Sequence, residues 1–167
     1  LQNTTLGNDR SGTVDCNLNL LKAVELALTG GRDLLPFHDP MTGKTEPVTQ
    51  AGPPTGDAAA FERWEQFWQA YTEQTAYIIR KCVDTYECSE SARALYFPTP
   101  YLSCLVRGCA EKGRDVTRGG AELNFTTLEA VTFATTVDSL LAIKYLVFDC
   151  RKFSMALLLA GASWPQC

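Results

Sequence analysis

The stretch that decides the fold is residues 98–149, which read PTPYLSCLVRGCAEKGRDVTRGGAELNFTTLEAVTFATTVDSLLAIKYLVFD. Pro100 stands at the predicted first position of a helix. Its missing N–H is harmless there because the first N–H groups of a helix have no partner within the helix. Thr99 is the expected cap of this helix, and Gly113 is its expected end. The first part of the stretch therefore predicts one helix, followed by a basic turn.

The second part of the stretch begins at a double glycine at 119–120. Residues 121–125 are mostly apolar and predict a short buried strand. Thr126 and Glu129 have the spacing of a capping box, in which each side chain binds the backbone N–H of the other residue. A second helix is therefore expected from there towards Phe148.

The flanking sequence predicts further helices around one long loop. Residues 17–29 place apolar side chains on one helical face. Residues 32–57 hold most of the prolines and show no apolar period, which predicts a surface loop. A long helix is expected to start at Asp57 as its N-cap and to end at a break over residues 89–97. Its apolar seam of about three heptads allows a coiled coil, but the broad stripe favours a helix packed on a larger core. Ser154 is the expected cap of a last helix.

The composition is that of a globular protein and excludes several functions. The chain has 167 residues, of which 46% are apolar and 20% charged, and its net charge is −4. Without a basic stripe, nucleic acid is not expected as a partner. The apolar runs are too short to cross a bilayer, so no membrane partner is expected either. Residues 1–167 are expected to form a single partial domain.

The seven cysteines do not have the spacing of a metal or disulfide framework. None forms C-x-x-C, their number is odd, and His38 is the one histidine, so no metal site is expected. Reduced, mostly packed thiols in a cytoplasmic protein are the preferred interpretation. His38 lies in a proline-rich segment and is predicted to be a solvent-exposed loop residue.

Arg10 is the one candidate for substrate binding. It lies in the segment GNDRSG at residues 7–12, which is flexible and rich in hydrogen-bonding groups. A guanidinium group there is able to hold a carboxylate through two parallel hydrogen bonds. The alternative is an arginine that only stabilises its own loop, and spacing alone favours that alternative.

The order of these elements resembles that of the glycyl radical enzymes, the pyruvate formate-lyase superfamily. The resemblance rests on the proline-opened helix, on EKGRDVT at 111–117, on the double glycine followed by Asn124, and on DSLLAIK at 138–144. It covers roughly residues 17–149 and implies an α/β fold. In that fold this chain is a mostly helical, internal fragment of the ten-stranded barrel in a pyruvate formate-lyase-like domain. A start at Leu1 without Met agrees with an internal segment.

Two segments narrow the resemblance to the large (alpha) subunit of benzylsuccinate synthase. They are ELNFTTLEAVTF at 122–133 and LGNDRSGTVD at 6–15. This implies a carbon–carbon lyase of anaerobic toluene degradation, which adds toluene or a similar aromatic hydrocarbon to fumarate to give benzylsuccinate. Arg10 would then bind fumarate. The implied protein partners are an activating enzyme and the small accessory subunits of the full complex.

The resemblance also implies a radical mechanism. A protein-derived glycyl radical, installed by an S-adenosylmethionine/iron–sulfur activating enzyme, oxidises a cysteine, and the thiyl radical takes hydrogen from the substrate. Both the thiyl cysteine and the radical glycine are expected outside residues 1–167. The chain alone is therefore expected to hold no catalytic residue, cofactor or metal and to be inactive.

Two other interpretations stay open. One is a glycyl radical diol dehydratase or lyase. The other is a helical binding or scaffold domain without chemistry. A Gly-Cys motif followed by Glu-Pro upstream of this chain would favour a dehydratase or lyase.

Overall fold

The computed structural model describes residues 10–11, 16–35, 37–38, 41–46 and 49–161, with the backbone alone at residues 10–11, 37–38 and 46. These residues belong to two compact units. Unit 1 comprises Leu1–Leu18 and Arg80–Glu129, and unit 2 comprises Asn19–Ile79 and Ala130–Cys167. The expectation that residues 1–167 are part of one larger domain is not tested by this division and stays a prediction.

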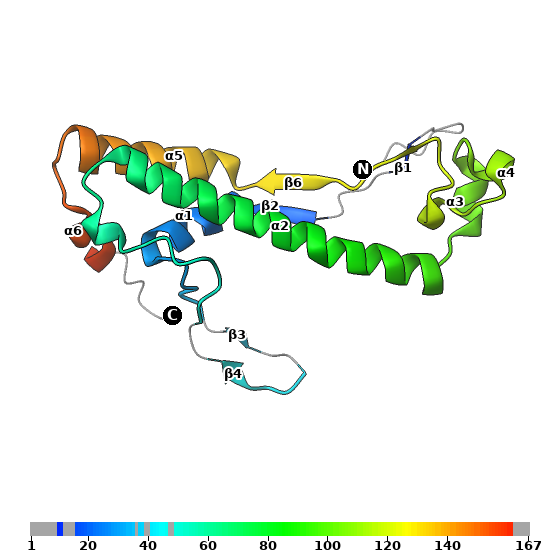
Figure 1. The fold of residues 1–167 in the computed structure, drawn as a ribbon, viewed down its shortest axis with the longest axis horizontal. Coiled ribbons are helices and arrows are strands. Elements are labelled where there is room, and N and C mark those ends of the chain that lie inside the picture. The colour runs from blue at the N-terminus through cyan, green and yellow to red at the C-terminus, as the bar shows by residue number, and fades with distance from the viewer. Residues whose placement is uncertain (1–9, 12–15, 36, 39–40, 47–48, 162–167) are drawn as a thin grey trace. The chain divides into compact units, whose positions relative to one another are not determined.

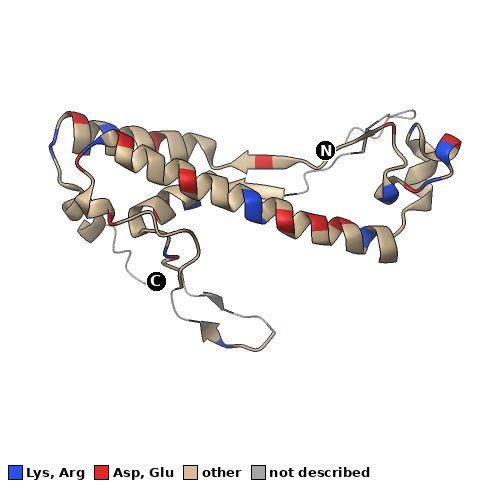
Figure 2. Ribbon diagram, in the orientation of Figure 1, with Lys and Arg blue, Asp and Glu red and all other residues tan. Residues whose placement is uncertain are grey.

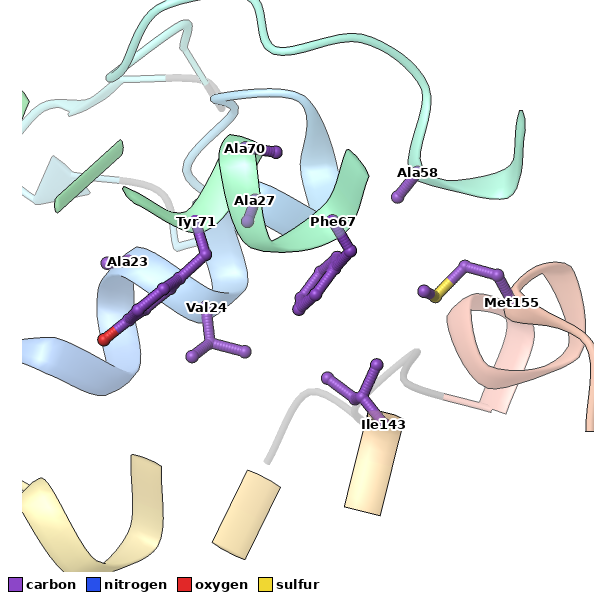
Figure 3. Close-up of a cluster of buried hydrophobic side chains, with 9 residues drawn as sticks. All are labelled: Ala23, Val24, Ala27, Ala58, Phe67, Ala70, Tyr71, Ile143 and Met155. Carbon is purple, nitrogen blue, oxygen red and sulfur yellow. The ribbon is translucent and has the colours of Figure 1, made fainter. Parts of the chain in front are cut away.

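Unit 2 is built from helices that share one apolar core. Its helices are α1 (Leu20–Thr29), the first part of α2 (Trp64–Tyr96), α5 (Phe133–Ile143) and α6 (Met155–Gly161), with α5 continuing into the π-helical turn η3 (Lys144–Asp149) (Figure 1). Figure 3 shows their buried side chains converging on Phe67, which is 0% exposed. This is the packed core that the apolar faces of the sequence predict, and the expected helix reaching Phe148 is confirmed in α5 and η3.

The first predicted helix begins later than its apolar period suggests. Strand β2 (Cys16–Asn19) occupies the predicted first turn, and the N–H of Cys16 donates to the carbonyl of Thr127 at 3.2 Å. The partner strand is distant in sequence, so local periodicity did not reveal it. Asn19 then caps α1 by accepting from the N–H groups of Leu21 (3.1 Å) and Lys22 (3.3 Å).

The loop between α1 and α2 is mostly irregular, as predicted, but carries a small hairpin. Strand β3 (Phe37–His38) pairs antiparallel with β4 (Thr45–Glu46), and Arg32 bridges to Gln50 at the base. A short helical turn, η1 (Ala58–Ala60), ends the loop.

The long helix differs from the prediction at both ends. Asp57 caps η1, accepting from the N–H of Ala59 at 3.0 Å, and α2 begins only at Trp64. The break expected over residues 89–97 is wrong, because α2 is continuous to Tyr96. The segment holds neither glycine nor proline before Pro98, and its serines are only mildly unfavourable in a helix. The helix ends where a following proline disfavours helical backbone.

The buried stripe of α2 favours core packing over a coiled coil. Its buried residues are Phe67, Ala70, Tyr71 and Gln74, whereas Trp68 of the predicted seam is 44% exposed. The stripe is therefore shifted to one side of that seam, and its buried part lies within the first three turns of the helix.

Unit 1 contains two short strands paired in parallel. Strand β1 (Arg10–Ser11) lies beside β5 (Leu123–Asn124), with Arg10 opposite Leu123 and Ser11 opposite Asn124. The strand expected over residues 121–125 therefore exists, but it is shorter than expected and its two side chains are exposed. Only Ala121, just before it, is buried.

The proline-opened helix is divided in two. Helix α3 (Pro100–Leu105) is followed by α4 (Cys109–Lys112), with Gly113 closing α4 as expected. The division falls at Val106, whose backbone is extended (φ −103°, ψ 127°). The next turn needs φ +91° at Gly108. Thr99 is the N-cap residue of α3, as expected, but its side chain makes no capping hydrogen bond.

The capping box expected at Thr126 and Glu129 is also wrong. Residues Leu128–Val131 form strand β6, a hydrogen-bonded neighbour of β2, and α5 starts after it. The hydroxyl of Thr126 instead donates to Glu90 at 3.0 Å. The expected cap of the last helix is confirmed, since Ser154 Oγ accepts from the N–H of Leu157 at 3.2 Å. Within the described residues, no helix has both the length and the apolarity needed to cross a membrane.

Candidate functional site

The candidate site is the parallel pair of β1 and β5 in unit 1. Arg10, the predicted substrate-binding residue, lies on β1 opposite Leu123. The structure describes the backbone of Arg10 and not its side chain, so a role in binding stays a prediction. On β5 and directly after it, Leu123 and Phe125 are 47% and 48% exposed. These two side chains are therefore not part of the core of this chain.

A glycine turn leads the chain into β5. Gly119 has φ +75°, in the left-handed region that glycine adopts without steric cost. A Cβ on Gly120 would overlap the carbonyl oxygen of Arg114, so the backbone passes too close there for any side chain. Only glycine fits at position 120, and this fixes the path on which the chain enters the strand.

The carboxylate of Asp115 is the centre of a hydrogen-bond network in front of this turn. Its Oδ1 accepts from the N–H (2.9 Å) and the hydroxyl (2.7 Å) of Thr117. Its Oδ2 accepts from the N–H of Thr99 (3.0 Å) and the hydroxyl of Ser103 (2.9 Å). The Ser103 Oγ in turn accepts from the N–H of Val116 at 2.9 Å. One side chain thus joins the start of α3 to the short helical turn η2 (Val116–Arg118).

The network stabilises the ionised form of Asp115. Partial burial raises the pKa of this carboxyl, but the bonds from Thr117, Ser103 and Thr99 outweigh that effect and lower the pKa to about 2. Asp115 is therefore an anion at neutral pH, and all four of its bonds are charge-assisted. With its two oxygens each accepting two hydrogen bonds, it serves as a structural anchor.

Further bonds hold the segment between the turn and β5. The ammonium of Lys112 donates to the carbonyl of Ala121 at 2.8 Å, and the amide of Asn124 donates to the same oxygen at 3.1 Å. The N–H of Glu122 donates to the carbonyl of Arg107 at 3.0 Å. The entry to β5 is thus fixed by backbone as well as side-chain bonds.

Sequence reasoning missed the role of Asp115. The spacing of Asp115 and Thr117 is typical of a turn in which an Asp side chain binds the backbone two residues on, and that signal was present. The bonds to Thr99 and Ser103 join residues more than ten positions away and have no local signature.

The six cysteines that the structure describes are free, and their burial differs. Cys109 is buried, and burial and then the nearby Asp115 charge raise the pKa of its thiol. Burial and then a hydrogen bond with Cys16 raise the pKa of Cys82. The expectation of packed thiols is wrong for three exposed residues: Cys88, Cys104 and Cys150. Cys167 lies outside the described residues. Among the residues that are described, no His, Cys, Asp and Glu side chains are grouped for a metal ion.

The distribution of charged residues and the position of His38 were also predicted from the sequence. In the ribbon of Figure 2, basic and acidic residues are interspersed along the described helices. His38 lies on β3, but its side chain is not described, so its predicted exposure stays a prediction.

Comparison with known proteins assigns the family. Residues 3–163 match the model of the pyruvate formate lyase-like family. The chain therefore belongs to the pyruvate formate-lyase-like family of glycyl radical enzymes.

Curated relatives are dehydratases and lyases. The chain is 37% identical over 142 residues to trans-4-hydroxy-L-proline dehydratase of Clostridioides difficile, covering 85% of this chain and 17% of that protein. It is 31% identical to (2S)-3-sulfopropanediol dehydratase of Klebsiella oxytoca, over 83% of this chain and 16% of the relative. It is 34% identical to isethionate sulfite-lyase of Oleidesulfovibrio alaskensis, with coverages of 83% and 16%. The chain thus spans about one sixth of the length of these relatives.

Solved structures agree with this assignment. Hydroxyproline dehydratase from Clostridioides difficile matches 87% of this chain with a TM-score of 0.73 and 36% identity. Glycerol dehydratase from Clostridium butyricum matches 92% of it with a TM-score of 0.77 and 30% identity. The chain covers 17% and 18% of these two structures. The α/β barrel expectation is therefore supported at the level of the family, with this chain a largely helical part of such a fold.

Proposed function

We propose that the whole protein to which this chain belongs is a glycyl radical dehydratase or lyase. Its proposed substrate is a small hydroxylated molecule with a carboxylate or sulfonate group. The observation that carries the proposal is the chemistry named in its relatives, which act on hydroxyproline, sulfopropanediol and isethionate. Each of these molecules has a hydroxyl group and an anionic group.

This reaction replaces the fumarate addition expected from the sequence. The named relatives and structures act on hydroxylated substrates, and none of their names includes fumarate, toluene or benzylsuccinate. The proposed net reaction breaks one C–O or C–S bond and releases water or sulfite. It needs no external oxidant or reductant, because the hydrogen atom taken from the substrate is returned to the product.

The part of this chain in the reaction is proposed to be binding. Arg10 lies on β1, next to the exposed side chains of β5. A guanidinium group binds a carboxylate or sulfonate through parallel N–H donors and keeps its charge at every physiological pH. We therefore propose that Arg10 binds the anionic group of the substrate.

The radical chemistry is assigned to the rest of the protein. In this family a protein-derived glycyl radical, installed by an S-adenosylmethionine-dependent activating enzyme, supplies hydrogen-atom abstraction. We assign the thiyl role to none of the described cysteines. The buried thiol of Cys109 packs in the small core of unit 1 with Val106 and Ala121, and this packing explains its position.

The test is an activity panel with the full-length protein, activated without oxygen by its activating enzyme. The substrates are trans-4-hydroxy-L-proline, isethionate, 3-sulfopropanediol, 1,2-propanediol and glycerol, with toluene plus fumarate as the competing reaction. We expect turnover of at least one hydroxylated anion, detected as water loss or sulfite release. Formation of benzylsuccinate without any elimination product would refute the proposal.

The role of Arg10 is tested in the same protein. Loss of hydrogen bonds to a charged group costs about 1.5–3 kcal/mol, so Arg10→Ala is expected to raise KM for the anionic substrate roughly 10- to 100-fold. Arg107→Ala is the matched control, since Arg107 is an exposed arginine of the same unit. An unchanged KM in Arg10→Ala, or an equal rise in Arg107→Ala, would contradict the role.

A further inference from the structure

We propose that Asp115 is a positioning residue that holds β5, and through it Arg10 on β1, in the geometry needed to bind the substrate anion. This inference rests on the proposed function, because it assigns Asp115 a role that acts through Arg10. Asp115 does not itself need to touch the substrate.

The first step is the double anchoring of Asp115. Its side chain binds Thr99, Ser103 and Thr117, as described above. Its backbone carbonyl accepts from the N–H groups of Arg118 and Gly120, both at 3.0 Å. The same residue therefore fixes α3 on one side and the glycine turn on the other.

The second step is the rigidity of the connection from the turn to β5. Gly120 passes so close to the backbone of Arg114 that a Cβ there would overlap the Arg114 carbonyl oxygen, so the turn is closely packed at this point. Ala121 follows and is 0% exposed, and its carbonyl is held by Lys112 and Asn124. A shift of the Asp115 backbone is therefore expected to move the backbone of β5 as well, because the segment between them is held by close packing and hydrogen bonds.

The third step is the ladder between the two strands. Leu123 lies opposite Arg10 in the parallel pair, only three residues after Gly120. Each strand is two residues long, and their parallel pairing sets the Arg10 backbone directly beside Leu123. The Arg10 backbone is thus paired with β5, and the chain enters β5 from the turn that Asp115 holds.

The hydrogen-bond network of Asp115 does not have the character of a ligand-binding site. All four hydrogen bonds of the carboxylate go to the protein itself, which leaves it little capacity for a further donor. Its hydroxyl and amide partners are likewise engaged in local structure. An anion held in this way serves to fix the backbone, and the backbone that it fixes leads to the candidate site.

The experiment is a double-mutant cycle between Arg10→Ala and Asp115→Asn in the full-length, activated protein. Rates are divided by the glycyl radical content measured by electron paramagnetic resonance, with trans-4-hydroxy-L-proline, isethionate and 3-sulfopropanediol as substrates. Asp115→Asn loses the charge and turns one acceptor into a donor. We expect it to raise KM about tenfold and to change kcat by less than about threefold, since small displacements of a binding group already cost this much.

The cycle separates positioning from general stability. If Asp115 acts through Arg10, Asp115→Asn will have little further effect on KM when Arg10 is already alanine. If Asp115 only stabilised the fold, Asp115→Asn would raise KM by the same factor with Arg10 and with alanine at position 10. Asp84→Asn makes the same chemical change at an exposed position of α2 in the same unit and is expected to leave KM unchanged.

A milder pair of variants covers the case in which Asp115→Asn does not fold. Thr117→Val and Ser103→Ala each remove one hydroxyl donor to the carboxylate, and each is expected to raise KM severalfold with Arg10 present and not with Arg10→Ala. Additive effects throughout would overturn the positioning role and leave the role of Arg10 intact. No effect of Arg10→Ala, or no turnover of any of the three anions, would overturn the proposed function and this inference with it.

Discussion

Thr132 donates its hydroxyl to Oδ1 of Asn19 at 2.9 Å, although the two residues are 113 positions apart. The same Asn19 oxygen caps α1. The carbonyl of Thr132 accepts from both the N–H (2.9 Å) and the hydroxyl (2.8 Å) of Thr136 in α5. Thr132 thus connects the first turns of α1 and α5. It does so at φ +62°, an unusual backbone conformation for a β-branched residue.

Replacing Thr132 tests how much this connection contributes. Thr132→Ala removes the bond to Asn19 and the oxygen that accepts from the N–H of Leu21 at 3.2 Å. It is expected to destabilise unit 2 by about 1–2 kcal/mol, since one hydrogen bond has a net value of about 1 kcal/mol. Thr132→Ser keeps the hydroxyl and removes the β-branching that disfavours positive φ, so it is expected to be neutral or mildly stabilising. The measurement is the midpoint of thermal unfolding of the full-length protein. Equal midpoints for the two variants would mean that the hydroxyl contributes nothing.

Local signals in the sequence predicted most of the helices. The capping of the last helix by Ser154, the closure of α4 at Gly113 and the course of α5 each depend on residues within a few positions. Such features follow from hydrogen bonds and apolar periods that are complete within a short window. For the same reason Pro100 marked the start of α3 correctly.

The errors arose where a distant partner decided the structure. Leu18 and Leu128 belong to neighbouring strands because β2 and β6 pair, yet both were predicted as helix. The apparent capping box at Thr126 was outweighed by that pairing. In the candidate site, the binding role of Arg10 came from its local context together with the family resemblance and stays a prediction. The network of Asp115 was not predicted, because its partners Thr99 and Ser103 lie more than ten positions away.

Gly120 is expected to be intolerant of any side chain. A Cβ there would overlap the carbonyl oxygen of Arg114, which is backbone and has little room to move. Gly120→Ala is therefore expected to destabilise unit 1 by about 1–3 kcal/mol, as overpacking does. Gly161→Ala is the control, because nothing lies within 4 Å of a Cβ at that position. Hydrogen exchange of the segment around β5 measures the effect, and equal exchange in the two variants would contradict it.

The ion pairs of Lys22 predict a pH dependence in unit 2. Its ammonium lies 2.6 Å from Asp33 Oδ1 and 2.7 Å from Glu25 Oε1. Burial raises the pKa of Asp33, but its hydrogen bonds with Lys22 and Leu35 lower it below the ordinary 3.8. The stabilisation from Asp33 is therefore fully present above pH 3.8 and is lost as the pH falls through the lower pKa of the folded state.

Asp33→Asn tests this dependence. The pair is partly exposed, so the variant is expected to lose only about 0.5–1 kcal/mol at neutral pH. The difference in thermal midpoint between wild type and Asp33→Asn should shrink as the pH is lowered from about 7 through the pKa of Asp33 in the folded state, because protonation removes the charge that the variant also lacks. Asp138→Asn, an aspartate of α5 in the same unit, is the control. A difference that stays constant over this range would show that Asp33 acts through something other than its charge.

Gln74 anchors the loop after the hairpin to α2 from a fully buried position. It is 0% exposed, and its amide nitrogen donates to the carbonyl of Pro53 at 2.7 Å and to the hydroxyl of Thr55 at 3.0 Å. Its oxygen has no hydrogen-bond partner among the described residues and lies so close to Gly52 that a Cβ there would overlap it. The site therefore needs a donor on one side and glycine on the other.

Gln74→Glu keeps this shape and replaces the donor by an acceptor. An ionised carboxylate would face the Pro53 carbonyl without a bond, so the variant is expected to lose about 2–4 kcal/mol at neutral pH. Burial raises the pKa of such a carboxyl, and its protonated form is able to donate to Pro53 again. The loss in thermal midpoint should accordingly become smaller as the pH falls towards about 4. Gln69→Glu makes the same change at an exposed position of the same helix and is expected to cost little at any pH. If both variants lost the same stability, or if the loss at position 74 did not depend on pH, the buried donor would not be what holds the loop.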